Sequence, residues 1–469
     1  MNSRQAGVLV FATLLLSYAW FFQGGGYNPN SRLALTRALV ERGTLAIDAY
    51  PVTGDWAEHA GRRYTNKAPG LSFLAAPAWA LTQGVAPEPA GEALSLRTWL
   101  VNAAVNALPA ACLGWLLFGV LGRLGAGSER LRAAAALVYG LGTLAFPYAT
   151  AFYAHQPAAA ASFAAFAALL AADTSPRARL LAAAAGAAAG LAVALEVSCV
   201  LVAAGLGLWL LADSRRRRHL PLYVAGGLPF ALALGLYTAA AFGSPWSLWF
   251  EQANPTIEIR VEGRLFGAPS LVNVIELLGM PYRGLFYTSP VLLLAFAGWP
   301  RLRRAQPAVA TLCAALPLAF LLLISSFHAW YGGWAPGPRY LVPALPFLFV
   351  PVAFAFGSWP RIGALLAALS VASMLVLTSV AVEIPSGFAD PLLDFALPRF
   401  LAGELAVNPA LLDVRLPPPS YALGEARPNG ASFNVGELLG ASGLASIAPL
   451  VASWCVAGAA LAFGHRRSR

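Results

Sequence analysis

The sequence predicts an all-α, polytopic membrane protein, and two observations carry that prediction. Of the 469 residues, 58% are hydrophobic and only 11% are charged, whereas about 25% of the residues of a soluble domain are charged. Apolar runs of roughly 15–25 residues also recur along the chain, and an α-helix of that length crosses a bilayer. We therefore expect a transmembrane helical bundle of about 11–13 helices.

The polar segments between the apolar runs are too short to form a separate soluble core. Residues 1–469 are thus predicted to form a single integral membrane domain. The first run, Val8–Phe22, is expected to be a retained helix, because no A-x-A cleavage site follows it. A long polar loop comes next, in which Asn30 or Ser31 is predicted to cap a short helix that ends at Gly43 and lies on the membrane surface.

The net charge of +10 comes largely from arginine clusters that lie between apolar runs. The clearest are Ser214–His219, Arg301–Arg304 and His465–Arg469. Cytoplasmic loops of membrane proteins collect such charge, so we assign these clusters to the cytoplasmic side and not to nucleic-acid binding. The outer loops are then predicted to be residues 23–67, 243–283, 328–339 and 383–435.

Two apolar runs in the first half are not predicted to be single membrane-crossing helices. With the first residue inside and every run crossing once, the basic loops do not all fall on one side, so one run must be re-entrant or split. Ala68–Val85 is the candidate, because it is short and is interrupted by Gly70 and Pro77. Leu180–Leu211 is long enough for two helices and contains Glu196, an ionisable residue that we expect to face a cavity or a partner.

Charged and aromatic side chains gather in the predicted outer segments. They are Asp48, Asp55, Arg62, Arg63, Tyr64 and Lys67 in the first loop, and His155, Arg283, His328, Trp334, Arg339 and Tyr340 in later ones. Arginine and lysine bind phosphate and stabilise it as it leaves, and a carboxylate accepts the proton of an attacking hydroxyl. This combination favours sugar transfer from a polyprenyl-phosphate donor on the outer side of the membrane.

Each of these residues also has a purely structural interpretation. Arg62 and Arg63 can pair with lipid phosphates, Asp48 and Asp55 can be turn residues, and the tryptophan and tyrosine residues suit the interfacial belt. A polyprenyl-lipid flippase or transporter is the alternative function. It needs ionisable groups and broken helices near the middle of the membrane, and only Glu196 fits that description.

Several stretches resemble, in the same order, blocks of bacterial membrane glycosyltransferases of the GT-C type. The most similar group is that of the dolichyl-phosphate-mannose protein mannosyltransferases. In the first loop the stretches read NSRLALTRALVERGTLAID and TGDWAEHAGRRYTNKAPGLSFLAAP. Later ones read FYAHQPAAAASF, FGSPWSLWF, YRGLFYTSPVLLL, WYGGWAPGPRYLVPALPF and FNVGELLG.

The resemblance implies a GT-C-like fold and a hexosyl- or pentosyltransferase of the bacterial inner membrane, with its active site facing outward. It implies an acidic base in the first outer loop and basic residues near the donor phosphate, which favours Asp48 or Asp55 with Lys67 and Arg339. The family often has an acidic residue directly after the first helix. This chain reads GGGYNPNSR there, with Asn28 and Asn30.

Together, the residues and the resemblance give one set of predicted roles. Asp55 is the first choice for the base and Asp48 the second. The donor phosphate is predicted to contact Lys67, Arg63, Arg283 and Arg339, and the substrates are predicted to be positioned by Tyr64, His155, His328, Trp334 and Tyr340. The expected partners are the lipid-linked donor, an acceptor of open identity (lipid, glycan or protein) and membrane lipids.

No cofactor is assigned with certainty from the sequence. The four cysteines lie far apart in apolar runs and have neither metal-ligand nor disulfide spacing. A divalent cation held by the outer carboxylates remains an open alternative to a metal-free site.

Overall fold

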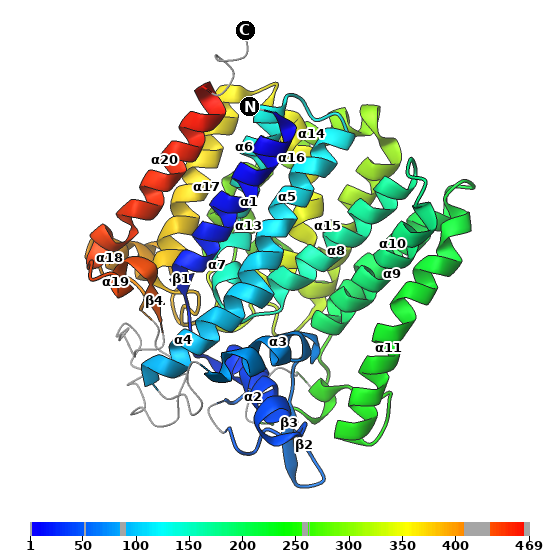
Figure 1. Cartoon of the computed structure of the whole chain (residues 1–469), viewed down its shortest axis with the longest axis vertical. Helices are drawn as coiled ribbons and strands as arrows, with labels where there is room; N and C mark the ends of the chain where they lie inside the picture. Colours follow the sequence, from blue (N-terminus) through cyan, green and yellow to red (C-terminus); the bar gives the residue numbers. More distant parts are fainter. Residues whose placement is uncertain are drawn as a thin grey trace.

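The computed structural model describes residues 2–50, 53–84, 91–255, 261, 263–407 and 432–463. These residues form a helical bundle with two small two-stranded sheets, which confirms the predicted all-α class. Helix α1 (Ser3–Trp20) begins, and helix α20 (Ala448–Phe463) ends, at one end of the bundle. The first long loop lies at the opposite end (Figure 1).

Eight of the described helical segments are long and apolar enough to cross a membrane. They are Leu94–Arg123, His155–Ala172 (α8), Ala178–Leu195 (α9), Arg217–Phe242, Pro307–Ser326 (α15), Arg339–Phe356, Pro360–Val380 (α17) and Gly443–Phe463. Four further described helices run alongside them in Figure 1, namely α1, α6 (Glu129–Gly142), α10 (Val200–Leu211) and α14 (Leu294–Ala305).

Several of the long segments combine elements that carry separate labels. Leu94–Arg123 joins α4 (Gly91–Asn102) to α5 (Leu108–Arg123), Arg217–Phe242 contains α11 (Leu220–Phe242), and Arg339–Phe356 contains a 3₁₀ segment, Arg339–Ala344, followed by α16 (Leu345–Phe356). The remaining described helices are short: α7 (Ala145–Thr150), α12 (Leu271–Leu278), α13 (Leu285–Thr288), α18 (Leu397–Leu401) and α19 (Val435–Leu438).

The two ambiguous runs of the first half have clear positions in the structure. Helix α3 (Gly70–Leu81) packs against α2 (Tyr27–Arg42) beyond the end of the bundle and does not cross it (Figure 1). The run Leu180–Leu211 breaks at Glu196 into the antiparallel helices α9 and α10. The turns at the other ends of these helices are joined by an ion pair of 2.8 Å between Arg216 Nη2 and Asp173 Oδ2.

Helix α2 starts earlier than predicted. It begins at Tyr27, directly after Gly26, and has no side-chain cap. Pro29 is compatible with this start, because proline is tolerated in the first turn of a helix. Ser31, one of the two predicted caps, instead donates its hydroxyl to the Asp55 carbonyl oxygen at 2.5 Å. Its Oγ also lies 2.6 Å from Thr65 Oγ1. The predicted end at Gly43 is confirmed, since its N–H donates to the Ala38 carbonyl.

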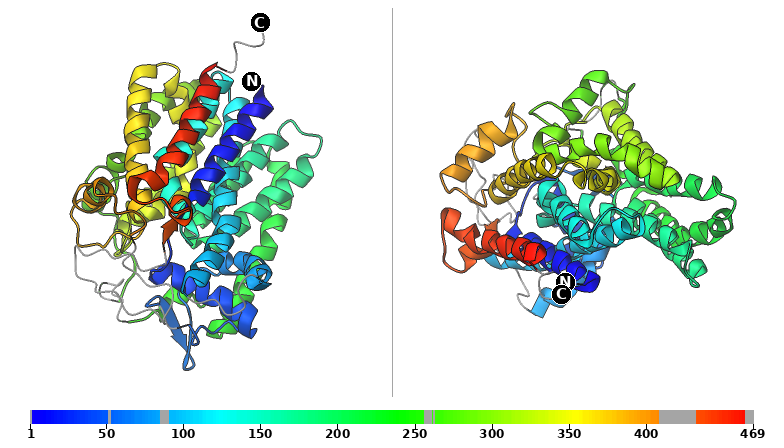
Figure 2. Two further views of the ribbon diagram at one scale, coloured as in Figure 1. Left: turned by 60° about the vertical axis from the view of Figure 1, so that its left-hand side comes forward. Right: turned by 90° about the horizontal axis from the view of Figure 1, so that it is seen from above.

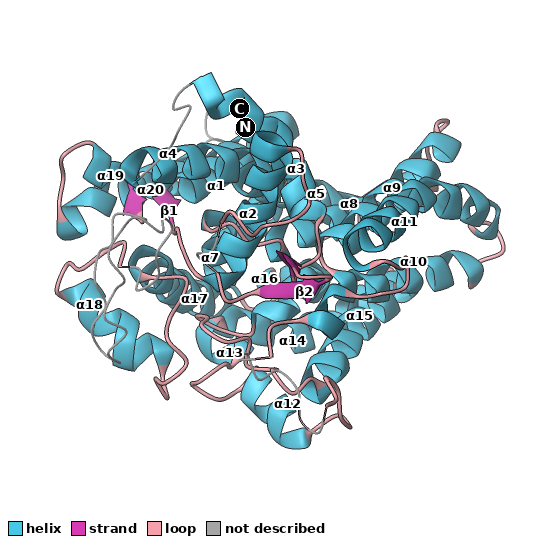
Figure 3. Ribbon diagram, turned by 90° about the horizontal axis from the view of Figure 1, so that it is seen from below, coloured by secondary structure: helices cyan, strands magenta, loops and turns pink. Residues whose placement is uncertain are grey.

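A β-hairpin within the first loop was not predicted. Strands β2 (Trp56–His59) and β3 (Arg62–Thr65) pair antiparallel around Ala60 and Gly61, whose φ angles of 50° and 73° suit a two-residue hairpin turn. Seen from below, strand β2 lies over the middle of the bundle (Figure 3). Because Trp56 pairs with Thr65, Asp55 and Lys67 flank the base of the hairpin on its two sides.

Small residues bring α11 close to α9, which carries the alanine-rich tract Ala182–Ala189. A Cβ atom added at Gly186 would overlap the Tyr223 carbonyl, and one added at Gly226 would overlap the Ala183 carbonyl. Backbones that approach this closely gain van der Waals contact, which is a main source of helix association in lipid.

The two ends of the chain are joined in space. Strand β1 (Phe21–Phe22) pairs antiparallel with β4 (Phe433–Asn434), and Trp454 Nε1 donates to Ser17 Oγ at 2.8 Å. Both views in Figure 2 accordingly place α20 next to α1.

The topology predicts that the α10–α11 turn and the hairpin tip lie on opposite sides of the membrane. Ser214 and Glu58 are both exposed, so Ser214→Cys and Glu58→Cys, each in a variant that lacks the four native cysteines, test this directly. A membrane-impermeant maleimide added to one side of sealed vesicles is expected to label only one of them, and the other only from the opposite side. Labelling of both from the same side would contradict the topology.

Candidate active site

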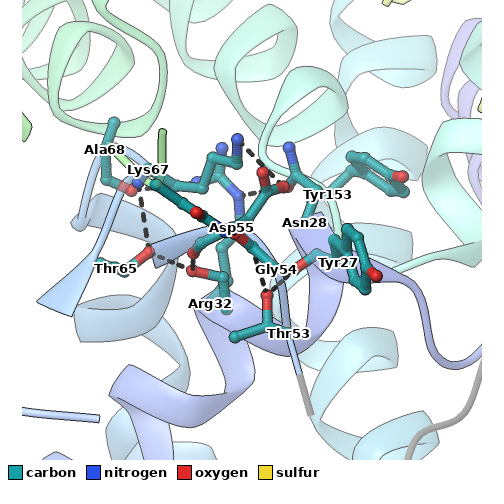
Figure 4. A network of polar contacts seen from close by, with 12 residues as sticks. Tyr27, Asn28, Arg32, Thr53, Gly54, Asp55, Thr65, Lys67, Ala68 and Tyr153 are labelled. Carbon is teal, nitrogen blue, oxygen red and sulfur yellow. Dashed lines mark hydrogen bonds and ion pairs between the residues drawn. The ribbon is translucent and has the colours of Figure 1, made fainter. Parts of the chain in front are cut away.

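An ion pair at the base of the hairpin is the first element of the site. Lys67 Nζ lies 3.0 Å from Asp55 Oδ2, and these side chains are 21% and 13% exposed, so the pair is reachable but not fully solvated. Local hydrogen bonds fix the backbone on both sides, since Asp55 N donates to Thr53 Oγ1 and Lys67 N to Thr65 Oγ1. Figure 4 shows the two charged groups facing one another, with Arg32 beside them.

Arg32 connects this loop to the membrane helices. Its guanidinium is buried and donates to Glu196 Oε1 (2.7 Å), to Asn28 Oδ1 (3.0 Å) and to the Ala68 carbonyl (3.0 Å). Glu196 therefore has the partner predicted for it, and it lies in the turn between α9 and α10, not in the middle of the membrane. Asn28, near the place where the resemblance leads one to expect an acid, serves as an acceptor for Arg32.

His155 opens helix α8 and contacts the same carboxylate. Its Nδ1 lies 3.4 Å from Glu196 Oε1, and the imidazole is buried. The ring stacks on Tyr153 at a centroid distance of 5.6 Å and meets Tyr148 and Tyr340 edge-on at 5.4 and 5.8 Å. The side chain is thus held in one orientation by aromatic rings on three sides.

Arg339 and Glu383 complete the cluster. Arg339, the first residue of its 3₁₀ segment, donates from Nη1 to the Tyr153 hydroxyl at 3.2 Å, and Tyr153 in turn donates to Glu383 Oε1. Glu383 follows α17 and is 7% exposed. Burial raises the pKa of the Glu383 carboxyl to about 7, because the hydrogen bond from Tyr153 and the charge of Arg339 oppose the cost of desolvation only in part, while Asp55 adds to it.

Glycine is required at the turn where Glu383 meets the first loop. Gly26 has a φ of +87°, which side-chain-bearing residues rarely adopt. A Cβ atom at this position would also overlap the Glu383 carboxylate. The turn between α1 and α2 is therefore shaped around a carboxylate that comes from more than 350 positions later in the chain.

Three predicted first-loop residues lie apart from this cluster. Asp48 is exposed and accepts a hydrogen bond from the Arg63 backbone N–H at 3.0 Å, as a turn residue does. The Arg63 guanidinium lies over the Trp56 ring at 4.5 Å, and Tyr64 packs edge-on against Phe242 at 5.4 Å. These contacts describe a stabilised hairpin.

The loop at 328–339 is held by Arg283. This side chain is fully buried and donates to the carbonyl oxygens of Tyr331 (2.8 Å), Gly333 (2.8 Å) and Tyr282 (2.9 Å). His328 donates its backbone N–H to the Leu265 carbonyl at 3.0 Å, and Trp334 is half-buried in the same loop. Arg283 thus supports the loop that carries Arg339.

Arg32, Tyr153 and Glu383 belong to the cluster but were not among the site residues predicted from the sequence. One signal was available for Arg32, since the lone acid Glu196 in an apolar run calls for a cationic partner. Glu383 carried a weaker signal of the same kind, as an acid at the end of the apolar run Ile362–Val382.

The described site does not fit a divalent cation. The three carboxylates, those of Asp55, Glu196 and Glu383, are engaged by Lys67, by Arg32 and by Tyr153. Within the described ranges, no group of three or more His, Cys, Asp or Glu side chains is placed to share an ion. We therefore assign no step to a metal.

The Arg32–Glu196 contact predicts a characteristic stability pattern. Arg32→Met leaves the Glu196 carboxylate without its main partner, and breaking a buried ion pair in this way costs about 3–5 kcal/mol. Adding Glu196→Gln removes the unpaired charge, so the double variant is expected to be more stable than Arg32→Met alone. Thermal melting of the purified protein in detergent measures this, and additive losses in the double variant would contradict the assignment.

Comparison with known proteins identifies the fold. No protein-family model and no curated protein sequence matches the chain. Among solved structures, the oligosaccharyltransferase AglB from Archaeoglobus fulgidus, in complex with an inhibitory peptide and a dolichol-phosphate, is similar with a TM-score of 0.53 and 13% identity, over 89% of this chain and 61% of that one. The A. fulgidus enzyme tethered to an acceptor peptide gives a TM-score of 0.51 and 12% identity, over 79% and 55%.

ArnT from Cupriavidus metallidurans in the apo state gives a TM-score of 0.48 and 19% identity, over 83% of this chain and 68% of that one. The chain spans about three fifths of the length of the oligosaccharyltransferase structures that it matches. The fold expected from the resemblance to GT-C type membrane glycosyltransferases is thus confirmed: this chain has the polytopic helical fold of AglB.

Proposed function

We propose that this protein is a membrane glycosyltransferase that moves a sugar from a polyprenyl-phosphate donor to an acceptor on the side of the membrane opposite the arginine-rich turns. The observation that carries the proposal is the Asp55–Lys67 ion pair, which lies in one cluster with Arg339 and next to membrane-embedded helices. A carboxylate and two cations at one membrane edge match the needs of this reaction. The transferred unit is a hexose or a pentose.

The proposed reaction assigns a role to each charged group. The acceptor hydroxyl oxygen bonds to the anomeric carbon, the bond from that carbon to the phosphate oxygen breaks, and its electron pair stays on the phosphate. Asp55 accepts the hydroxyl proton. As Asp55 becomes neutral, Lys67 loses its carboxylate partner and can turn to the phosphate, which has just gained charge. Arg339 supplies a second positive charge there.

An apolar cavity beside the site suits the polyprenyl chain. A cavity of about 360 Å³ lies between α14, α15 and α16. Leu341, two residues after Arg339, and Leu285, two residues after Arg283, form part of its wall, and it reaches Trp299 and Pro351 in the membrane helices. A lipid whose phosphate lies at Arg339 would therefore find an apolar path directly next to it.

The comparison with AglB supports the same substrate class, because its structure holds a dolichol-phosphate. The arginine-rich turns support an outward-facing site by the positive-inside rule. In a bacterium this corresponds to the periplasmic or external face of the inner membrane. The acceptor is a lipid, a glycan or a protein.

The observation that favoured a flippase or transporter has a different explanation. Glu196 lies in the turn between α9 and α10 and is paired with Arg32 and His155. An ion pair at the membrane edge does not provide the mid-membrane binding site that transport needs.

Asp55→Asn is expected to lower kcat about 100-fold or more, because general-base catalysis contributes typically 10²–10⁴-fold. Asp48→Asn, on the exposed turn, is the matched control and should keep the wild-type rate. Sugar transfer in isolated membranes supplied with a polyprenyl-phosphate sugar measures both. Full activity in Asp55→Asn would show that this carboxylate is not the base.

Arg339→Lys is expected to raise the donor KM about 10-fold or more. A lysine keeps the charge but loses the planar fork that binds phosphate in two-point contact, and 1.4 kcal/mol of lost binding is tenfold. Arg63→Lys on the hairpin provides the control, with no change in KM expected. The same transfer assay at varied donor concentration separates the two, and equal KM values would argue against phosphate contact by Arg339.

A further inference from the structure

Glu383 is linked through Tyr153 to Arg339, the proposed phosphate ligand. The reaction proposed above assigns no role to Glu383. Its side chain is 7% exposed, and its carboxylate fills the space beside Gly26. Its Oε1 accepts a hydrogen bond from the hydroxyl of Tyr153, which in turn contacts Arg339.

The hydrogen bonds in this chain have a defined direction. The Tyr153 hydroxyl has one proton, which it donates to Glu383 Oε1, so its oxygen is left to accept from Arg339 Nη1 at 3.2 Å. Ionised Glu383 fixes this arrangement, because a carboxylate is only an acceptor. The Arg339 guanidinium also lies over the Tyr153 ring at 5.3 Å, so Tyr153 holds it by two contacts.

Several charged or titratable groups act on Glu383. They are Arg339 from the 3₁₀ segment, Asp55 from the loop before β2, and Tyr148 and Tyr153 from the segment between α6 and α8. Arg339 is the one cation among these four. An anion bound at Arg339 would offset the charge that keeps Glu383 ionised.

We propose that Glu383 is a positioning residue, which holds Arg339 through Tyr153 and takes up a proton when a phosphate monoester dianion binds beside Arg339. The identity of the anion rests on the proposed function, in which transfer converts a phosphodiester with one negative charge into a phosphate monoester with two. Asp55 first holds the acceptor's proton, which offsets that charge. Once Asp55 has released this proton to solvent, one proton taken up by Glu383 keeps the net charge of the buried cluster the same as before the reaction.

The pH dependence of proton uptake follows from the pKa of Glu383. Burial has already raised the pKa of Glu383 to about 7, and a nearby anion raises it further. Proton uptake on binding is therefore largest just above pH 7 and disappears at low pH, where Glu383 is already protonated. At about pH 7.5 a phosphate monoester, with a second pKa of about 6, is already a dianion and takes up little itself.

The test is calorimetric titration of the purified full-length protein with a short-chain prenyl monophosphate at about pH 7.5, in buffers of different ionisation enthalpy. Wild type is expected to take up about half a proton or more per molecule bound, given a pKa that starts near 7. Glu383→Gln should bind with uptake close to zero. Glu404→Gln, whose side chain is 59% exposed, is the matched control and should behave as wild type.

Tyr153→Phe provides a second variant that does not alter the carboxyl group. It breaks the link to Arg339, so it is expected to raise the donor KM with a smaller effect on kcat. Loss of the Tyr153 hydrogen bond also raises the pKa of Glu383, so the pH at which proton uptake is largest should move upward. Thermal melting of each purified variant establishes that it is folded. A rise in KM no larger in Tyr153→Phe than in Glu404→Gln would overturn the positioning role.

Inorganic phosphate, titrated in parallel, distinguishes the source of the anion. Uptake with both probes means that the phosphate group alone is recognised, and uptake with prenyl phosphate alone means that the lipid is needed. Equal uptake in wild type and Glu383→Gln would overturn this inference while the proposed function stands. Absence of sugar transfer by wild-type protein would instead contradict the proposed function.

Discussion

The buried ion pair between Arg32 and Glu196 is the contact on which the arrangement of the site depends. Both charges have left water, and each would be costly there without the other. The pair fixes α2, which belongs to the first loop, against the turn between α9 and α10, which belongs to the membrane bundle. The hairpin follows α2, so the position of Asp55 and Lys67 relative to the membrane helices is set by a contact that neither residue makes.

The cluster around this pair contains as many positive as negative groups. Lys67, Arg32 and Arg339 alternate with Asp55, Glu196 and Glu383. In a region of low dielectric this balance makes burial tolerable, and it also makes each charge sensitive to changes in the others. The proposed reaction moves one proton and adds one negative charge to the phosphate, so it would change the electrostatic energy of every charged group in the cluster.

Much of the fold could be predicted from the sequence, because the signals are local. The length of the apolar runs predicted the membrane helices. The arginine clusters predicted that the turns that carry them lie on the same side of the membrane. Asp55, Lys67, His155 and Arg339 were among the predicted residues and do come together. Asp48 and Asp55, however, could not be distinguished from the sequence. The register of the hairpin decides which of them lies at its base, and that register was not predicted. Arg32 and Glu383 escaped notice because their partners are 164 and 230 positions away and no periodic pattern connects them.

The base and the tip of the hairpin are constrained differently. Asp55 and Lys67 stand at its base, one on each side, while its tip extends away from the bundle. Because side chains alternate along a strand, residues can be added in pairs at the tip without changing the face that each base residue presents. The length and chemistry of the tip can therefore vary while the spacing of the charged pair at the base stays the same.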